Sequence, residues 1–164
     1  MTPPFMLHVR TEETAMIPRI LSAGVLATLT TAALAAHEPR DENAPPEPTY
    51  KVECAEGATS ATQCKVDKET YVGWREYKAN CQVCHGGGGM GSTFAPNLQE
   101  RFNKEGVDWP RFYYVIEHGY TGQMGAMPPW DKNKRVMKMR ANLYRYLKAR
   151  ADGKLPLGRP GRMK

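Results

Sequence analysis

The sequence lacks any stretch in which apolar and polar residues alternate for long enough to form a β-sheet. Apolar residues recur instead three and four positions apart, which is the spacing of a helix with one buried face. We expect such helices over residues 67–82, 108–119 and 133–153, bounded by Asp or Asn at their starts and by Gly at the ends of the last two. The sequence therefore predicts an all-α fold.

A strongly apolar run of the length that spans a membrane, about 20 residues, is also missing. The nearest candidate, residues 20–36, is uncharged but is diluted by four Ser and Thr residues. It follows Arg19 and ends in a small-x-small pattern that suits signal peptidase. We predict a cleaved signal peptide over residues 1–36 and no stable membrane insertion afterwards. Translation starting at Met16 would give this signal a more ordinary, less acidic beginning.

Apolar residues are scarce in the segment that follows the predicted signal. Residues 37–50 are polar and Pro-rich, with too few apolar side chains to bury, and are expected to form a flexible leader. The folded domain is then expected to cover residues 51–164, a length sufficient for one hydrophobic core.

Acidic residues are nearly absent from the last part of the chain. Residues 132–164 contain 12 basic residues and only Asp152 as an acidic one, whereas residues 37–131 contain 9 basic and 14 acidic residues. A solvated helix face explains most such runs. A surface of one sign can also steer a charged partner during docking. Nucleic acid is a poor candidate for that partner, because the chain is expected to be exported.

Cysteine is infrequent, with four residues, all downstream of the predicted signal. Outside the cytoplasm, cysteines usually form disulfides or hold cofactors. We predict a disulfide between Cys54 and Cys64, which would close an eleven-residue loop. A pair of unlinked thiols is the alternative.

The other two cysteines lie in the pattern C-x-x-C-H, formed by Cys81, Cys84 and His85. Two thiols three residues apart can reach one edge of a porphyrin, and the adjacent histidine can then meet the iron axially. A redox dithiol does not need that histidine, and a zinc site would need a second ligand pair that Cys54 and Cys64, ten residues apart, do not supply. We predict one covalent haem c, because no histidine follows Cys64.

The second axial ligand of the iron has several candidates. Most methionines only fill the core. Met127 is favoured because the two prolines after it stiffen the chain, and because a thioether ligand raises the reduction potential of a carrier. Met124 and His118 remain the alternatives. The six side chains considered are His118, Met90, Met124, Met127, Met137 and Met139.

These motifs together resemble the class I cytochromes c. The resemblance rests on C-x-x-C-H, then G-S-T-F-A-P-N-L (91–98), M-P-P-W (127–130) and L-Y-R-Y-L-K (143–148), and extends over residues 67–153. It implies a helical fold wrapped around one haem, with His85 and Met127 as metal ligands. It also implies that Gly73 and Tyr77 of the first helix meet Tyr146 of the last. The carbonyl of Pro96 is expected to accept a hydrogen bond from the His85 imidazole.

A narrower resemblance is carried by residues 65–77 and by the tail L-K-A-R-A-D-G-x-L-P-x-G-R-P (147–160). Both are similar to periplasmic cytochromes of methanol metabolism, which accept electrons from PQQ-dependent methanol or alcohol dehydrogenases. This implies a periplasmic, non-enzymatic electron carrier that passes electrons to a downstream cytochrome or terminal oxidase. Two alternatives stay open: a respiratory carrier between the cytochrome bc1 complex and an oxidase, and a haem enzyme or sensor with an open iron position.

Overall fold

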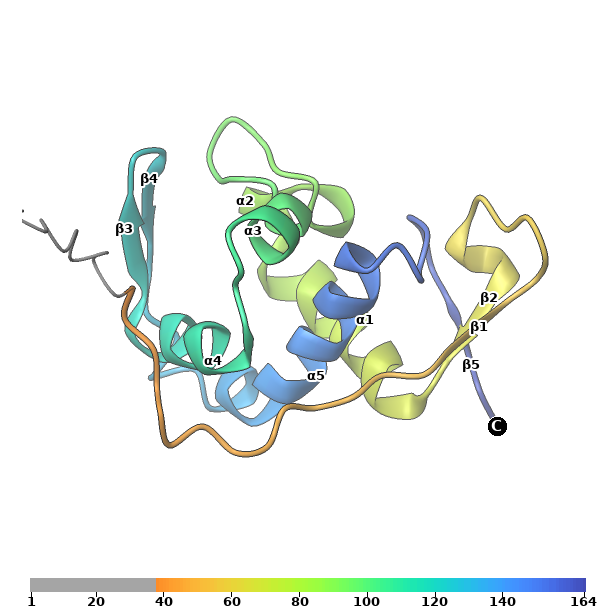
Figure 1. Cartoon of the computed structure of the whole chain (residues 1–164), viewed down its shortest axis with the longest axis horizontal. Coiled ribbons are helices and arrows are strands. Elements are labelled where there is room, and N and C mark those ends of the chain that lie inside the picture. The colour runs from red at the N-terminus through yellow and green to blue at the C-terminus, as the bar shows by residue number, and fades with distance from the viewer. Residues whose placement is uncertain (1–37) are drawn as a thin grey trace, which may run out of the picture. The chain divides into compact units, whose positions relative to one another are not determined.

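The computed structural model describes residues 38–164, so the predicted signal peptide lies outside the described residues. The described part is mainly helical, which confirms the predicted all-α class (Figure 1). None of its helices is long and apolar enough to cross a bilayer. Its α-helices are α1 (Lys68–Asn80), α2 (Gln82–His85), α3 (Leu98–Lys104), α4 (Trp109–His118) and α5 (Lys134–Ala151).

Helices α1 and α5 make the closest contact of the fold. Gly73 of α1 is buried against α5, where a Cβ atom would overlap the carbonyl group of Asn142 and lie 3.1 Å from Cβ of Tyr146. Only glycine allows two helix backbones to approach so closely. The Tyr77 and Tyr146 rings fill the space beside the contact, with centroids 5.4 Å apart. The expected crossing of the first and last helices is confirmed.

Helices α3 and α4 complete the core by packing aromatic rings onto α5. The ring centroids of Phe102 and Phe112 lie 5.6 Å and 5.3 Å from that of Tyr144. Asp108 begins α4 by accepting a hydrogen bond from the backbone N–H of Arg111, as its position in the sequence predicted. Helix α3 was not predicted. Asn97 begins it by accepting from two backbone N–H groups, directly after a proline and a glycine-rich stretch that hid the signal.

The strands are too short to form a buried layer. One sheet has the order β1–β2–β5, from Val52–Cys54, Cys64–Val66 and Gly161–Arg162. A separate hairpin pairs β3 (Tyr120–Gly122) with β4 (Gly125–Met127). Strands of two or three residues leave no room for an alternating pattern, so the sequence gave no sign of them. The predicted disulfide between Cys54 and Cys64 is present and joins β1 to β2.

Residues 38–50, expected to be a flexible leader, are instead hydrogen-bonded to the helices (Figure 1). We call this segment the strap. The carbonyl of Pro45 accepts from the indole N–H of buried Trp109 at 2.6 Å, and Glu47 accepts from the hydroxyl of Tyr144 at 2.6 Å. That prediction considered only apolar burial. The strap instead satisfies polar groups of the core that would otherwise lack partners.

The contact at Gly73 gives a direct test of the fold. We expect Gly73→Ala to destabilise the holo-protein by more than about 3 kcal/mol, because the new methyl group meets helix backbone rather than a movable side chain. Thermal unfolding followed by circular dichroism measures the loss. Gly87→Ala is the matched control, since its Cβ would meet only Leu157 at 3.8 Å. Equal melting temperatures for the two variants would contradict the proposed packing.

A buried carboxylate near the same crossing gives a prediction on pH. Glu76 is only 3 % exposed, and hydrogen bonds from Arg135 hold its pKa below the usual value. A lowered pKa stabilises the fold above the unfolded-state pKa of about 4.3, and this stabilisation is lost as the pH falls through the lower folded-state value. We expect Glu76→Gln to melt several degrees below the unmodified protein at pH 7, with the difference shrinking below about pH 4. Glu53→Gln, at an exposed site, is the control and should melt close to the unmodified protein at pH 7.

Candidate functional site

The C-x-x-C-H motif lies where α1 gives way to the single turn of α2. The backbone N–H groups of Cys84 and His85 both donate to the carbonyl of Cys81, at 3.2 Å and 3.0 Å. This turn brings the two cysteines and the histidine to the wall of one cavity. The hydroxyl of Tyr77 donates to the carbonyl of Gly86 at 2.6 Å, so the helix crossing also fixes the end of the motif.

The His85 imidazole lies at the wall of this cavity. Its Nδ1 lies 3.4 Å from the carbonyl oxygen of Pro96, the partner that the resemblance implied. Burial lowers the pKa of His85, against the opposite effect of that carbonyl, so the imidazole is held neutral. Neutral imidazole is the form that binds a metal. When the Nδ1–H group donates a hydrogen bond to a carbonyl, Nε2 keeps its lone pair free to bind the metal.

The Cys81 thiol has the surroundings of an attachment site rather than of a redox dithiol. Burial raises the pKa of the Cys81 thiol to about 12, and the nearby Cys84 is the next largest cause of this rise. A catalytic dithiol needs the opposite shift, because the thiolate is the nucleophile. Cys54 and Cys64 are joined to each other, so they cannot complete a zinc site with this pair.

The motif opens into a cavity of about 710 Å³ between α2, the loop before α3, the β3–β4 hairpin and the core helices. This volume falls in the range of pockets that enclose small molecules and cofactors, roughly 300–1,000 Å³. Most of the walls are apolar. The apolar side chains around it are Phe94, Leu98, Phe102, Val107, Phe112, Val115, Ile116, Trp130, Leu143 and Leu147.

Met127 reaches this cavity from the hairpin. It lies in β4 opposite Tyr120 and is half-buried, and the chain from its carbonyl group to Pro129 packs against Gly119 at the end of α4. Met124 also lines the cavity but is 53 % exposed. The other candidates lie elsewhere. His118 stacks on Tyr114 at 4.1 Å outside the cavity lining, and Met90 is exposed.

Two arginines of the cavity were not predicted. The guanidinium groups of Arg101 and Arg111 lie 5.6 Å and 5.3 Å from the centroid of the Tyr120 ring, and all three residues line the cavity. Arg111 is buried, and its Nη1 forms an ion pair with the Glu38 carboxylate of the strap. An arginine beside an apolar helix stripe carries no recognisable signal in the sequence.

This donor set fits a haem. The molecule needs two thiols for its vinyl-derived carbons, axial nitrogen or sulfur ligands, apolar walls for the ring and cations for its two propionate carboxylates. The cavity offers Cys81, Cys84, His85 and Met127, and two arginines, Arg101 and Arg111, stand in its wall. The structure therefore brings all five predicted site residues, Pro96 included, to one place.

Comparisons with known proteins identify relatives of this chain. Residues 69–147 match the family model described as cytochrome C oxidase, cbb3-type, subunit III. The chain is 38 % identical over 122 residues to cytochrome c-553I of Paracoccus denitrificans, covering 70 % of this chain and 48 % of that protein. It is 38 % identical over 102 residues to cytochrome c-555 of Methylococcus capsulatus (strain ATCC 33009 / NCIMB 11132 / Bath), covering 62 % and 78 %.

A solved structure shares the fold as well. The crystal structure of c-type cytochrome XoxG from Methylobacterium extorquens AM1 is 40 % identical, with a TM-score of 0.57, over 61 % of this chain and 62 % of that one. The chain thus spans about half the length of cytochrome c-553I and somewhat under two thirds of XoxG.

The choice of axial ligand can be tested on the hairpin itself. We expect the ferric holo-protein to show the near-infrared sulfur-to-iron charge-transfer band at neutral pH, and Met127→Ala to abolish it. Met124→Ala removes the same side chain three residues away, from the exposed turn, and should leave the band unchanged. Loss of the band in Met124→Ala alone, or its absence from the unmodified protein, would contradict ligation by Met127.

Proposed function

Because the chain belongs to the c-type cytochromes, we propose that it is a periplasmic, monohaem electron carrier reduced by a PQQ-dependent methanol or alcohol dehydrogenase. The observation that supports the carrier role most is the meeting of the C-x-x-C-H motif and Met127 in one cavity. A ligand from each of two elements would close both axial positions of the iron. A closed iron suits one-electron transfer and leaves no position for a substrate or gas.

The side chains of the cavity have separate tasks in this proposal. The bound haem c supplies one-electron redox chemistry at an iron whose potential a thioether ligand raises. Cys81 and Cys84 would hold its edge covalently, and His85 would bind the iron in an orientation kept by Pro96. The walls around the ring would be mostly apolar, and Arg111, paired with Glu38, stands among them.

The mouth of the cavity is suited to brief contact with a partner. Val83 and Phe94 line the cavity, yet they are 81 % and 75 % exposed, and Met124 is 53 % exposed beside them. Exposed apolar side chains grouped in this way mark interaction sites. Electron-transfer encounters bury little surface, which favours such a small patch together with charge steering.

The choice of donor rests on sequence similarity. Residues 65–77 and 147–160 resemble cytochromes of methanol metabolism, and the structural relative XoxG is 40 % identical. The acceptor would be a downstream cytochrome or a terminal oxidase. A second candidate is a respiratory carrier between the cytochrome bc1 complex and an oxidase, which the name of the matching family model favours.

The donor can be tested by stopped-flow mixing of the ferric holo-protein with the organism's own methanol dehydrogenase and methanol. We expect rapid, saturable haem reduction. Its second-order rate should fall by about tenfold or more between roughly 0.01 M and 0.2 M salt, because the net charge of the chain is +6 and steering is screened.

A small-molecule reductant provides the control for this experiment. If it reduces the same sample readily while the dehydrogenase does not, the donor assignment is wrong and the respiratory carrier is favoured. Fast reduction whose rate does not change with salt would support the donor assignment but contradict docking through the basic residues of 132–164.

A further inference from the structure

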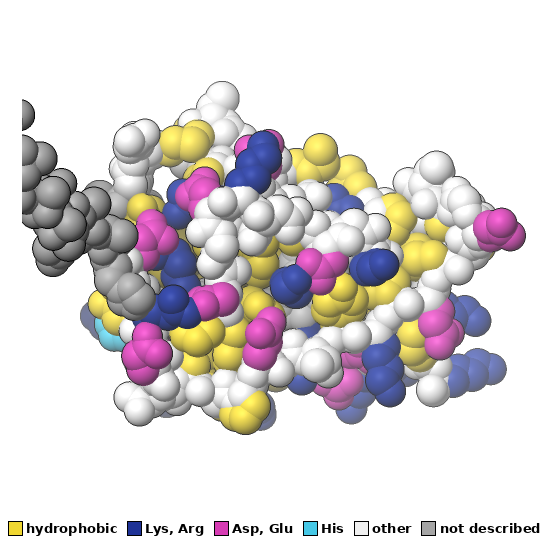
Figure 2. Space-filling view, viewed as in Figure 1, with side chains coloured by type: hydrophobic (Ala, Val, Ile, Leu, Met, Phe, Trp, Pro, Cys, Tyr) yellow, Lys and Arg dark blue, Asp and Glu magenta, His cyan; other side chains and the backbone are white. Residues whose placement is uncertain are grey.

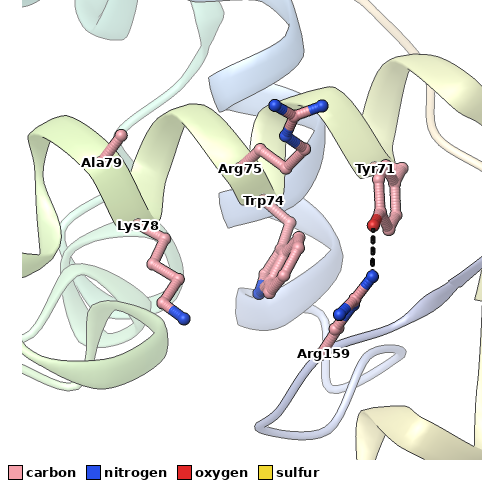
Figure 3. Close-up of a pocket in the computed structure, with 6 residues that line it drawn as sticks. All are labelled: Tyr71, Trp74, Arg75, Lys78, Ala79 and Arg159. Atoms are coloured by element: carbon pink, nitrogen blue, oxygen red, sulfur yellow. Dashed lines mark hydrogen bonds between the residues drawn. The ribbon is translucent and has the colours of Figure 1, made fainter.

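A second hollow, separate from the haem cavity, lies on the outer face of α1 (Figure 3). It has a volume of about 610 Å³ and shares no lining residue with the first cavity. Five of its residues recur at helical spacing on one face of α1. The sixth comes from residues 152–164, which follow α5 and which we call the C-terminal arm. We call it the α1 groove, formed by Tyr71, Trp74, Arg75, Lys78, Ala79 and Arg159.

The C-terminal arm is held so that Arg159 faces α1. Pro160 next to it is buried, and β5 directly after it pairs with β2. The carbonyl of Leu157 accepts from the backbone N–H of Ala61 at 3.0 Å, which fixes the arm on the other side. Nη2 of Arg159 then donates to the hydroxyl of Tyr71 at 3.3 Å (Figure 3). Residues 88 positions apart are thus joined in one site by the fold.

Like most cations of the basic C-terminal part, residues 132–164, the cations of the groove have no carboxylate partner in the described part of the chain. On the face that the strap crosses, basic and acidic side chains are interspersed (Figure 2). Arg140 and Lys148 of α5 form ion pairs with Glu117 and Asp152. Within residues 38–164, in contrast, none of the three groove cations forms an ion pair with a carboxylate. Those cations are Arg75, Lys78 and Arg159.

The groove also has an aromatic wall. Lys78 and Arg159 both lie 5.8 Å from the centroid of the Trp74 ring, which is within the range of cation–π attraction. Tyr71 lies 5.4 Å from the same ring. Trp, Tyr and Arg are the residue types that contribute most to protein–protein binding, and here they stand together on an exposed surface.

We propose that the α1 groove docks an acidic segment of a partner protein. Carboxylates of that segment would pair with Arg75, Lys78 and Arg159, while its apolar parts would contact the indole of Trp74. From Tyr71 to Lys78 the helix rises about 10 Å, which matches about three residues of extended chain. A membrane surface fits less well, because Trp74 and Tyr71 are half-buried and no large apolar side chain of the groove protrudes.

The position of the groove connects it to the haem site. Lys78 lies three residues, less than one helical turn, before Cys81. A partner held there would lie beside the attachment edge of the haem. Identifying that partner with the electron donor rests on the proposed function, whereas binding of an acidic segment does not.

The groove is tested without any dehydrogenase, by ¹⁵N NMR of the ferrous holo-protein titrated with a hexaglutamate peptide. We expect the indole N–H of Trp74 to shift and saturate, while that of buried Trp109, bonded to Pro45, stays fixed. The variant Lys78→Ala/Arg159→Ala should bind the peptide about tenfold more weakly. Both side chains are exposed, so the fold should survive.

A second double variant removes the same charge outside the groove. Lys104→Ala/Lys154→Ala should weaken peptide binding by less than about twofold. Equal losses in the two double variants, or no shift at Trp74, would overturn the proposal. So would binding to phosphatidylglycerol vesicles that depends on the groove cations when the peptide does not bind. Failure of the dehydrogenase to reduce the haem leaves these outcomes unaffected and bears on the donor alone.

Discussion

The close approach of α1 and α5 at Gly73 is the constraint on which the rest of the structure depends. It brings Tyr77 to the carbonyl of Gly86, and so fixes the turn that carries the two attachment cysteines. It also sets the position of α5, which supplies Leu143 and Leu147 to the haem cavity. A side chain larger than hydrogen at Gly73 would push α1 away from α5. It would therefore separate the turn that carries the two cysteines from Leu143 and Leu147.

Two extended segments, the strap and the C-terminal arm, are held against the helices by hydrogen bonds between polar groups. The strap accepts hydrogen bonds from Trp109 and Tyr144, two of the most buried rings of the core. At the other end of the chain, buried Arg150 donates to the carbonyl of Leu155 and, at 3.3 Å, to that of Gly88 in the loop after the haem motif. The C-terminal arm is thereby tied to the haem site and brought across α1.

The sequence predicted best where one residue decides the local structure. Asp67, Asp108 and Asn133 begin three helices through their own side chains. The strap and the β3–β4 hairpin were missed because they have no periodic apolar pattern. The buried Arg111 and the gathering of Arg159 with Trp74 depend on contacts between distant segments, which no local pattern encodes.

The proposed carrier has one haem, whose iron would be bound by His85 and Met127. Potentiometric titration of the holo-protein, followed by its optical spectrum, tests this most directly. A single transition with a slope of about 59 mV per decade is predicted, since one iron exchanges one electron. Two transitions would contradict it. So would an immediate change of the spectrum when carbon monoxide is added to the reduced protein or cyanide to the oxidised protein.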